Sequence, residues 1–172
     1  MKKIIVLLVF SFAVYTTQAQ AKKDRSGHLI GYAQKSDFLK QQYKGWFEHH
    51  YNKYQPDEKI IKKIKKNLKG VSVLCFMGTW CGDSKRETPR FYKIMEAANF
   101  NFKKNFQLVA VNRSKRTPDN LQEGKNIIRV PTFIFYKKGE EIGRYVEYPR
   151  ETMEKDILKI VQGKPYKHSY QK

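Results

Sequence analysis

Residues 71–89 read VSVLCFMGTWCGDSKRETP, and this stretch decides the expected fold. Its first seven residues are almost all apolar, which is typical of a strand buried on both faces of a sheet. The turn GTWCGD follows, and from Ser84 to Ala98 apolar residues recur at helical spacing. The stretch therefore predicts a buried strand that runs directly into a helix, with Cys81 in the turn between them.

The chain after this helix predicts further strands and a closing helix. Residues 106–111 (FQLVAV) are a second buried-strand pattern. Residues 130–136 and 141–146 are two β-rich runs joined by a turn with Gly139, which predicts an antiparallel hairpin. Residues 150–161 predict an amphipathic helix. This order indicates an α/β fold, a mixed central sheet flanked by helices.

Two more helices are expected before the first strand. Ser36 has the features of an N-cap, and apolar residues at spacings of three and four predict a helix that ends at Tyr54. Pro56 separates it from a second helix, which has an isoleucine face and ends at Gly70. We therefore divide the chain into a signal peptide (1–19), a linker (20–35), an N-terminal helical extension (36–69), a main α/β domain (70–165) and a tail (166–172).

The N-terminus has the three-part layout of a secretory signal. Lys2 and Lys3 precede an apolar run over residues 4–15, and small residues around Ala19 offer a cleavage site. The run is too short to span a bilayer comfortably, although an uncleaved membrane anchor is the alternative interpretation. We expect an exported protein, either periplasmic or secreted.

The charge balance is strongly basic and suggests an anionic partner. Lys and Arg number 35 against 16 Asp and Glu, a formal net charge of +19. Because export argues against nucleic acid, an anionic envelope surface is the candidate partner and no nucleic acid is expected. The helix before Gly70 concentrates lysines, which form either a solvated face, the favoured interpretation, or a binding surface: Lys59, Lys62, Lys63, Lys65, Lys66 and Lys69.

The two cysteines, Cys75 and Cys81, are too few for a disulfide-stapled scaffold and complete no zinc site. We expect neither a metal nor a cofactor. Cys81 lies where a helix begins, and the unpaired N–H groups and helix dipole there favour the thiolate, which is the nucleophile. Lys85 and Arg86 add positive charge, whereas Asp83 opposes it. The alternative interpretation is a cysteine left over in a decayed site.

These motifs resemble the thioredoxin superfamily. The strand followed by Trp80-Cys81-Gly82-Asp83-Ser84-Lys85 is similar to the strand and W-C-x-x-C-K of thioredoxins. Pro89 matches the proline of the active-site helix, Val130-Pro131-Thr132 matches the cis-proline triplet, and Gly139-Glu140 matches the hairpin turn. WCGD and the added N-terminal helices look more like a bacterial group of exported thioredoxin-like proteins. The resemblance covers residues 70–162.

The resemblance implies a thiol–disulfide exchange site with one sulfur missing. Cys81 and Ser84 stand at the catalytic positions, and a serine cannot resolve a mixed disulfide. Ser84 could instead donate a hydrogen bond to the Cys81 thiolate. In the family the cis proline leaves the preceding backbone, here Val130, free to pair with a client strand. The implied client-binding residues are Trp80, Gly82, Asp83, Val130 and Pro131.

Two further departures from the family pattern affect the site. Cys75 stands where thioredoxins hold a buried acid, and it fits there as a packed, inert thiol rather than as a disulfide partner of Cys81. The segment Val146-Glu147-Tyr148-Pro149 replaces a glycine that keeps the client surface open. We expect these bulky side chains to narrow the choice of client.

Three functions remain open at this point. The favoured one is monothiol exchange through Cys81, with mixed disulfides to client proteins that carry cysteines or disulfides and an external thiol or redox partner that releases them. Whether the site is catalytic is uncertain from sequence. The second is a non-catalytic thioredoxin-fold module that binds proteins, and the third is an adhesive envelope protein that binds by charge.

Overall fold

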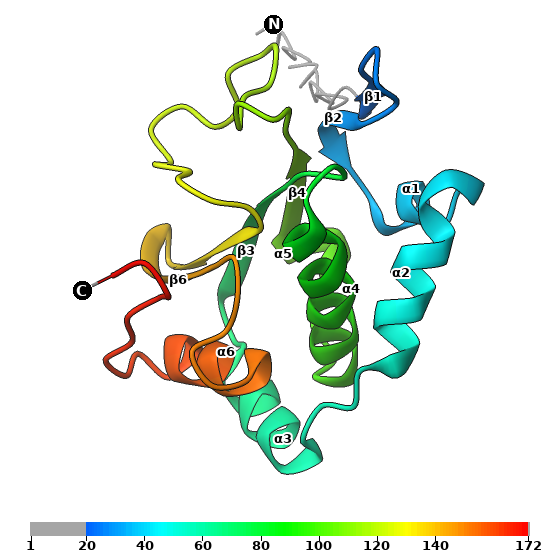
Figure 1. The fold of residues 1–172 in the computed structure, drawn as a ribbon. Coiled ribbons are helices and arrows are strands. Elements are labelled where there is room, and N and C mark those ends of the chain that lie inside the picture. Colours follow the sequence, from blue (N-terminus) through cyan, green and yellow to red (C-terminus); the bar gives the residue numbers. More distant parts are fainter. Residues whose placement is uncertain (1–19, 172) are drawn as a thin grey trace, which may run out of the picture.

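The computed structural model describes residues 20–171 and arranges them around a six-stranded sheet with the order β1-β2-β4-β3-β5-β6 (Figure 1). The strands are β1 (Lys22–Lys23), β2 (Leu29–Ala33), β3 (Val71–Met77), β4 (Phe106–Ala110), β5 (Thr132–Lys137) and β6 (Glu140–Val146). The helices are α1 (Lys35–Phe38), α2 (Gln41–Lys53), α3 (Glu58–Asn67), α4 (Gly82–Ala97), α5 (Phe102–Asn105) and α6 (Met153–Val161). This mixed sheet with flanking helices confirms the expected fold class.

The central strand β3 determines which segments meet at the site. It pairs parallel with β4 and antiparallel with β5, and β5 pairs antiparallel with β6. The ends of β3, β4 and β6 and the start of β5 therefore lie along one edge of the sheet. The turn after β3 and the segment before β5 become neighbours at this edge, although they are far apart in the chain.

The β5–β6 hairpin was predicted, and its turn explains the sequence between the strands. Lys138 and Gly139 both have positive φ, 54° and 85°, which is the pattern of a two-residue type I′ turn. Glycine adopts this conformation without steric cost. The turn fixes the register in which Thr132 faces Val146 at the site edge of the sheet.

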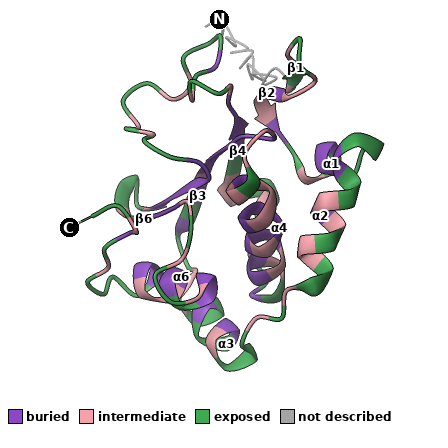
Figure 2. Ribbon diagram, in the orientation of Figure 1, coloured by how far each residue is buried: buried purple, intermediate pink, exposed green. Residues whose placement is uncertain are grey.

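The two faces of the sheet are covered differently. Alternate residues of β3, such as Val73 and Cys75, join the main core with α4, α2, α3 and α6. Phe76 belongs to a smaller cluster on the other face, which includes Val130 and partly buried residues of the connection over residues 111–131. This described connection contains turns and no helix. Figure 2 shows the buried strands and the buried inner sides of α4 and α6.

The expected linker over residues 20–35 is wrong, because this segment contains β1 and β2. Strand β2 adds to the sheet next to β4, with Gly31 opposite Ala110. Leu29 and Ala33 are buried, and the burial of these side chains is the physical reason that the segment forms a strand rather than a linker. The run Leu29-Ile30-Gly31-Tyr32-Ala33 is the sequence signal for this strand.

The first expected helix also differs from the structure. Instead of one helix from Ser36 to Tyr54, the chain forms α1, breaks at residues 39–40 and forms α2. Leu39 is 45% exposed, whereas the neighbouring Phe38 is buried and stacks on Phe47. The break allows the rings of Phe38 and Phe47 to enter the core. A continuous helix with Leu39 facing inward would not allow this.

The C-terminal tail is packed onto the domain over its described residues. Tyr166 donates a hydrogen bond from its hydroxyl to Asp156 Oδ2 at 3.1 Å, and His168 is buried. Tyr170 lies edge-on against Tyr148, with ring centres 5.9 Å apart. The tail is therefore part of the folded unit and returns to the segment after β6.

The expected signal peptide, residues 1–19, lies outside the described residues. Between residues 20 and 171, none of the helices has the length and apolar character needed to cross a membrane.

Candidate functional site

Cys81 lies at the N-terminus of α4, as the sequence predicted. It is the N-cap residue: its backbone is extended, and its carbonyl accepts the first helical hydrogen bond from Lys85 N–H at 3.0 Å. Its own N–H donates to Gly78 O at 2.9 Å, which closes the turn after β3. The side chain is partly exposed and forms no disulfide. The sulfur is therefore within reach of another molecule.

The Val130–Pro131 peptide bond is cis, as expected, and lies beside this sulfur. Cys81 Sγ is 3.2 Å from the Val130 carbonyl oxygen, which accepts a hydrogen bond from the thiol. Among the described residues Val130 N–H has no hydrogen-bond partner. A backbone donor without a partner thus lies next to the thiol, in a residue whose side chain is buried.

Trp80 packs between the turn and the strand β4. Its indole Nε1–H donates to Val111 O at 2.8 Å, and its ring packs in the small cluster with Val130. Gly78 makes this position available, because a Cβ there would lie 2.5 Å from Trp80 Cε2. The sequence analysis did not recognise this steric requirement for glycine.

Ser84 lies inside the protein and does not contact Cys81 as expected. Its side chain is fully buried, and its Oγ accepts a hydrogen bond from Gly78 N–H at 3.1 Å. No hydrogen bond joins Ser84 to Cys81 in the described structure. Because the hydroxyl faces the turn beneath the helix, Ser84 holds the backbone that carries Cys81 rather than the sulfur itself.

Asp83 and Gly82 begin α4 on its exposed side, and Asp83 is already paired. The Arg86 side chain donates to Asp83 Oδ1 and to Glu87 Oε1, both at 2.6 Å. Glu87 is fully buried and also accepts from the Tyr145 hydroxyl at 3.0 Å. This network, which the sequence analysis missed, fastens the first turns of α4 to β6.

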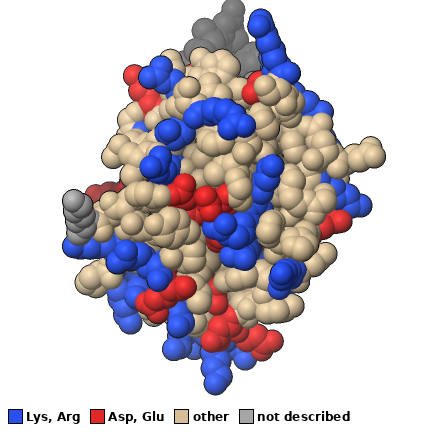
Figure 3. Space-filling model, in the orientation of Figure 1, with Lys and Arg blue, Asp and Glu red and all other residues tan. Residues whose placement is uncertain are grey.

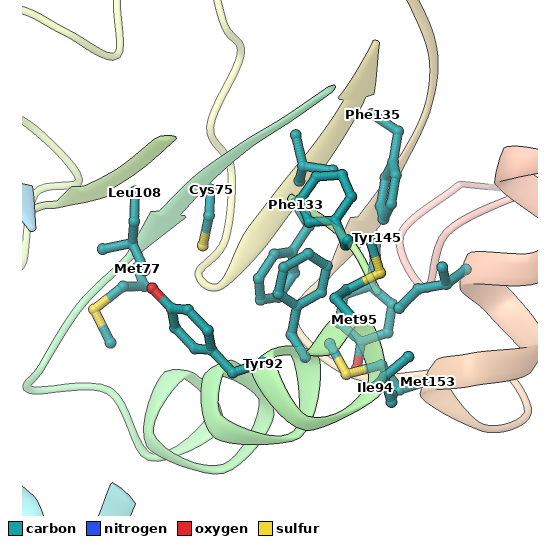
Figure 4. Packing of buried hydrophobic residues seen from close by; sticks show 14 of the residues in the cluster. Cys75, Met77, Tyr92, Ile94, Met95, Leu108, Phe133, Phe135, Tyr145 and Met153 are labelled. Carbon is teal, nitrogen blue, oxygen red and sulfur yellow. The ribbon is translucent and has the colours of Figure 1, made fainter. Parts of the chain in front are cut away.

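Cys75 has the inert environment that was predicted for it. It lies in the main core between the sheet and α4, with Tyr92 and Leu108 nearby (Figure 4), and it forms no disulfide. Burial raises the pKa of its thiol well above the ordinary value. Cys75 is therefore protonated and enclosed, so it cannot act as a second thiol for Cys81.

Glu147 lies beside the cis peptide, in a segment that contacts the tyrosines Tyr148 and Tyr170. Glu147 has a φ of 64°, a left-handed conformation that a glycine adopts more readily, and its N–H donates to Pro131 O at 2.8 Å. Burial, and then the charge of Asp83, raise the pKa of its carboxyl. Glu147 also accepts a hydrogen bond from the Tyr170 hydroxyl, beside the exposed Tyr148.

The arrangement brings most of the predicted site residues together. Trp80, Cys81 and Val130 share one cluster, Pro131 follows Val130, and Asp83 and Gly82 begin the helix above them. Chemically, the site offers one accessible sulfur, an unused backbone donor and no second accessible cysteine in the described chain. Such a site can form a mixed disulfide but cannot close an internal one.

Comparisons with known proteins agree with this geometry. The model of the family described as thioredoxin matches residues 32–159. A thioredoxin-like protein of Acanthamoeba polyphaga mimivirus is 32% identical over 95 residues, 55% of this chain and 65% of that protein. A thioredoxin of Arabidopsis thaliana is 28% identical over 95 residues, 55% of this chain and 63% of that protein. The chain thus spans slightly less than two thirds of these relatives' length.

A solved structure supports the fold over a larger part of the chain. A protein of unknown function from Pseudomonas aeruginosa is 14% identical, with a TM-score of 0.58, and the match covers 75% of this chain and 91% of that one. At this identity the match shows the fold alone. The family model covers well over half of the chain, and the cis peptide and the N-terminal cysteine of α4 lie within it. The chain belongs to the thioredoxin family.

Proposed function

We propose that this protein is an exported thiol–disulfide exchange protein that uses Cys81 alone. The observation that carries the proposal is the position of Cys81 Sγ, partly exposed at the start of α4 and 3.2 Å from the Val130 carbonyl beside the cis peptide. Family membership supports a redox role, and the layout of residues 1–19 supports export.

The exchange proceeds in two steps. The Cys81 thiolate attacks one sulfur of a client disulfide; a Cys81–client bond forms, the client S–S bond breaks and the other client sulfur leaves as a thiolate. An external thiolate then attacks the client sulfur of the mixed disulfide; a disulfide between the external thiol and the client forms, the Cys81–client bond breaks and Cys81 leaves as a thiolate. Ser84 has no sulfur and Cys75 is enclosed in the core, so the second thiol must come from another molecule.

Trapping of mixed disulfides tests this proposal directly. The exported protein is expressed in a bacterial host and separated on a non-reducing gel after acid quenching. We expect client adducts that disappear with reductant and that are absent from Cys81→Ala. Cys75→Ala is the matched control and should retain them, because its thiol is buried. Adducts that persist in Cys81→Ala would refute exchange through this sulfur.

A gain-of-function variant tests the role of the missing sulfur. Residues 81 and 84 are three apart at the start of α4 and share one side of the helix. Ser84→Cys should therefore give insulin disulfide reduction in the presence of dithiothreitol, at least about tenfold faster than the unchanged protein. Equal rates would mean that the site lacks more than a resolving cysteine.

A non-catalytic binding module is the second candidate, favoured by one contact. The Cys81 thiol already donates to the Val130 carbonyl, so the neutral form has a partner within the fold. A module of this kind would retain its clients without the sulfur. Affinity capture with Cys81→Ala separates the two: retained clients favour the module, and lost clients favour exchange.

A further inference from the structure

Two arginines flank the site, and each guanidinium lies over an aromatic ring. The Arg113 guanidinium carbon is 5.5 Å from the centre of the Trp80 ring, and that of Arg129 is 5.3 Å from the centre of the Tyr170 ring. Both arginines are exposed. Stacking on a ring holds a guanidinium in place while its N–H donors remain available at the edges.

The sheet order places these arginines on the two sides of Cys81. Arg113 follows β4, Cys81 follows β3, and Arg129 precedes β5, and the three strands are adjacent in the order β4-β3-β5. All three residues emerge at the same edge, because β4 is parallel to β3 and β5 is antiparallel to it. Cys81 therefore lies between two fixed positive groups.

Neither arginine has an ion-pair partner among residues 20–171, which is also true of Arg25, Arg116 and Arg150. Arg86, Arg90 and Arg144, by contrast, each bind a carboxylate at 3.0 Å or less. Asp83 binds Arg86, whereas Glu147 accepts a hydrogen bond from Tyr170 and is also influenced by the charge of Arg129, without an ion pair. The charge of Arg113 is thus available to a partner molecule, and that of Arg129 is offset in part by Glu147.

Figure 3 shows the charged side chains on the face of the molecule that carries the start of α4 and the connection after β4. Basic side chains are spread around a small acidic area near its centre. An acidic segment that crosses this face meets positive charge on both sides of the site. A basic segment would have to approach two unpaired arginines.

We propose that Arg113 and Arg129 bind carboxylates on both sides of the client cysteine, so that the preferred client is an extended, acidic segment. This inference rests on the proposed exchange function and adds its substrate class. The unused Val130 N–H gives the same segment a backbone contact between the two arginines.

The strand spacing predicts where the acidic residues lie in the client. β4 and β5 are separated by two strand spacings, roughly 10 Å. An extended chain advances roughly 3.3 Å per residue, so carboxylates two residues before and two residues after the cysteine reach the two arginines. A client with both carboxylates on one side of its cysteine would engage only one of them.

The test uses short peptides that carry one cysteine as a 2-thiopyridyl disulfide. Cys81 thiolate attacks the peptide sulfur, the S–S bond to thiopyridine breaks, and the released 2-thiopyridone is measured by absorbance. Three peptides differ only at the positions two before and two after the cysteine, which carry Glu, Gln or Lys. At low salt we expect the Glu peptide to react about tenfold faster than the Gln peptide and the Lys peptide to be slowest.

Charge-reversal variants assign the preference to these two residues. Arg113→Glu/Arg129→Glu should invert the order of the Glu and Lys peptides. The matched control is Lys62→Glu/Lys66→Glu, which changes the net charge equally but lies on α3, before the opposite end of β3. It should keep the order, and sodium chloride at about 0.5 M should reduce the preference to less than about twofold.

The outcomes separate this inference from the proposed function. Equal rates for the three peptides, or an inversion by the α3 control as well, would overturn the acidic-client inference and leave exchange intact. Release from none of them would overturn exchange, and a second arm then decides the binding inference. In that arm, the peptides carry Ser in place of Cys and a fluorescent label, and their binding to Cys81→Ala is measured by fluorescence anisotropy. Tighter binding of the Glu peptide supports the role of the two arginines, and equal binding of the three peptides refutes it.

Discussion

Cys75 and Cys81 are six residues apart, yet the fold places them in opposite environments. Cys75 lies in the middle of β3, opposite Leu108 and Phe133, with none of its surface exposed. Cys81 lies one turn beyond the end of the same strand, partly exposed at the start of α4. The reactivity of a thiol here is decided by where the strand ends rather than by the residue type.

The difference also shows how a site with a single accessible cysteine is kept ordered. Around Cys75 the core is apolar and closed, so the thiol packs there without a polar partner. Around Cys81 the order comes from hydrogen bonds: Gly78 to Ser84, Trp80 to Val111 and Cys81 to Val130. Changes at the first position should therefore affect stability, and changes around the second should affect reaction rates.

The largest expected effect comes from placing a carboxyl group in the buried position. Cys75→Asp puts an unpaired acid into the apolar core, which should lower the free energy of unfolding by about 3–5 kcal/mol. Urea denaturation followed by circular dichroism measures this. Cys75→Ala, which only removes the sulfur, should cost about 1 kcal/mol. If Asp were tolerated as well as Ala, the core around Cys75 would be wet rather than closed.

Gly78 offers a change that should affect Cys81 and leave Cys75 in place. Gly78→Ala brings a Cβ within 2.5 Å of the Trp80 ring, which must move and lose its bond to Val111. We expect the exchange rate of Cys81 to fall about tenfold or more. Gly45→Ala in α2 is the matched control, since a Cβ there meets nothing within 4 Å. A Gly78 variant with the unchanged rate would show that Trp80 does not position the thiol.

The burial of the Cys75 thiol should also make the unfolding free energy depend on pH. Burial raises the pKa of this thiol well above its ordinary 9.0, so the folded protein keeps a proton that the unfolded chain releases. The stability that this difference in pKa provides is fully present below pH 9. It is lost as the pH rises above 9, by up to about 1.4 kcal/mol of unfolding free energy per pH unit.

Unfolding free energies from pH 7 to pH 10 measure this loss. The unchanged protein should lose stability more steeply above pH 9 than Cys75→Ala. The tyrosines other than Tyr92 contribute equally to both proteins, whereas the pKa of Tyr92 is raised by burial and, in the unchanged protein, also by the charge of Cys75. Parallel curves for the two proteins would mean that the Cys75 thiol ionises as freely in the folded state as in the unfolded chain.

The smallest effect is expected at Glu147, which lies near the partly exposed Cys81 rather than near the buried Cys75. Glu147→Gly relaxes a φ of 64° and removes a side chain beside the cis peptide. Alkylation of Cys81 by a neutral reagent should become about two- to threefold faster, with unfolding free energy changed by less than about 1 kcal/mol. Glu147→Gln removes the charge but keeps the bulk. If Gln gave the same acceleration as Gly, charge rather than size would control access.

Local patterns in the sequence predicted the parts of the fold that form locally. The apolar run of β3, the start of α4 at Cys81 and the Lys138-Gly139 turn all depend on residues next to one another. Strand β2 was missed because its short run is half-exposed and becomes a strand only through pairing with β4.

The site was predictable only where a family motif marked it. The motif identified Cys81 and the cis Val130–Pro131 bond, whereas Ser84 was expected to contact the sulfur and instead binds Gly78. Arg113 and Arg129 were missed, because the adjacency of β4, β3 and β5 brings them to Cys81. Sequence spacing contains no information about such proximity.

The packed tail has a practical consequence for anyone who handles this protein. Tyr170 lies against Tyr148 and under Arg129, beside the segment that borders the reactive thiol. An affinity tag, a dye or a surface linker attached near Tyr170 would therefore lie beside Cys81. Attachment at the exposed lysines of α3, which precedes the opposite end of β3, keeps the label away from this thiol.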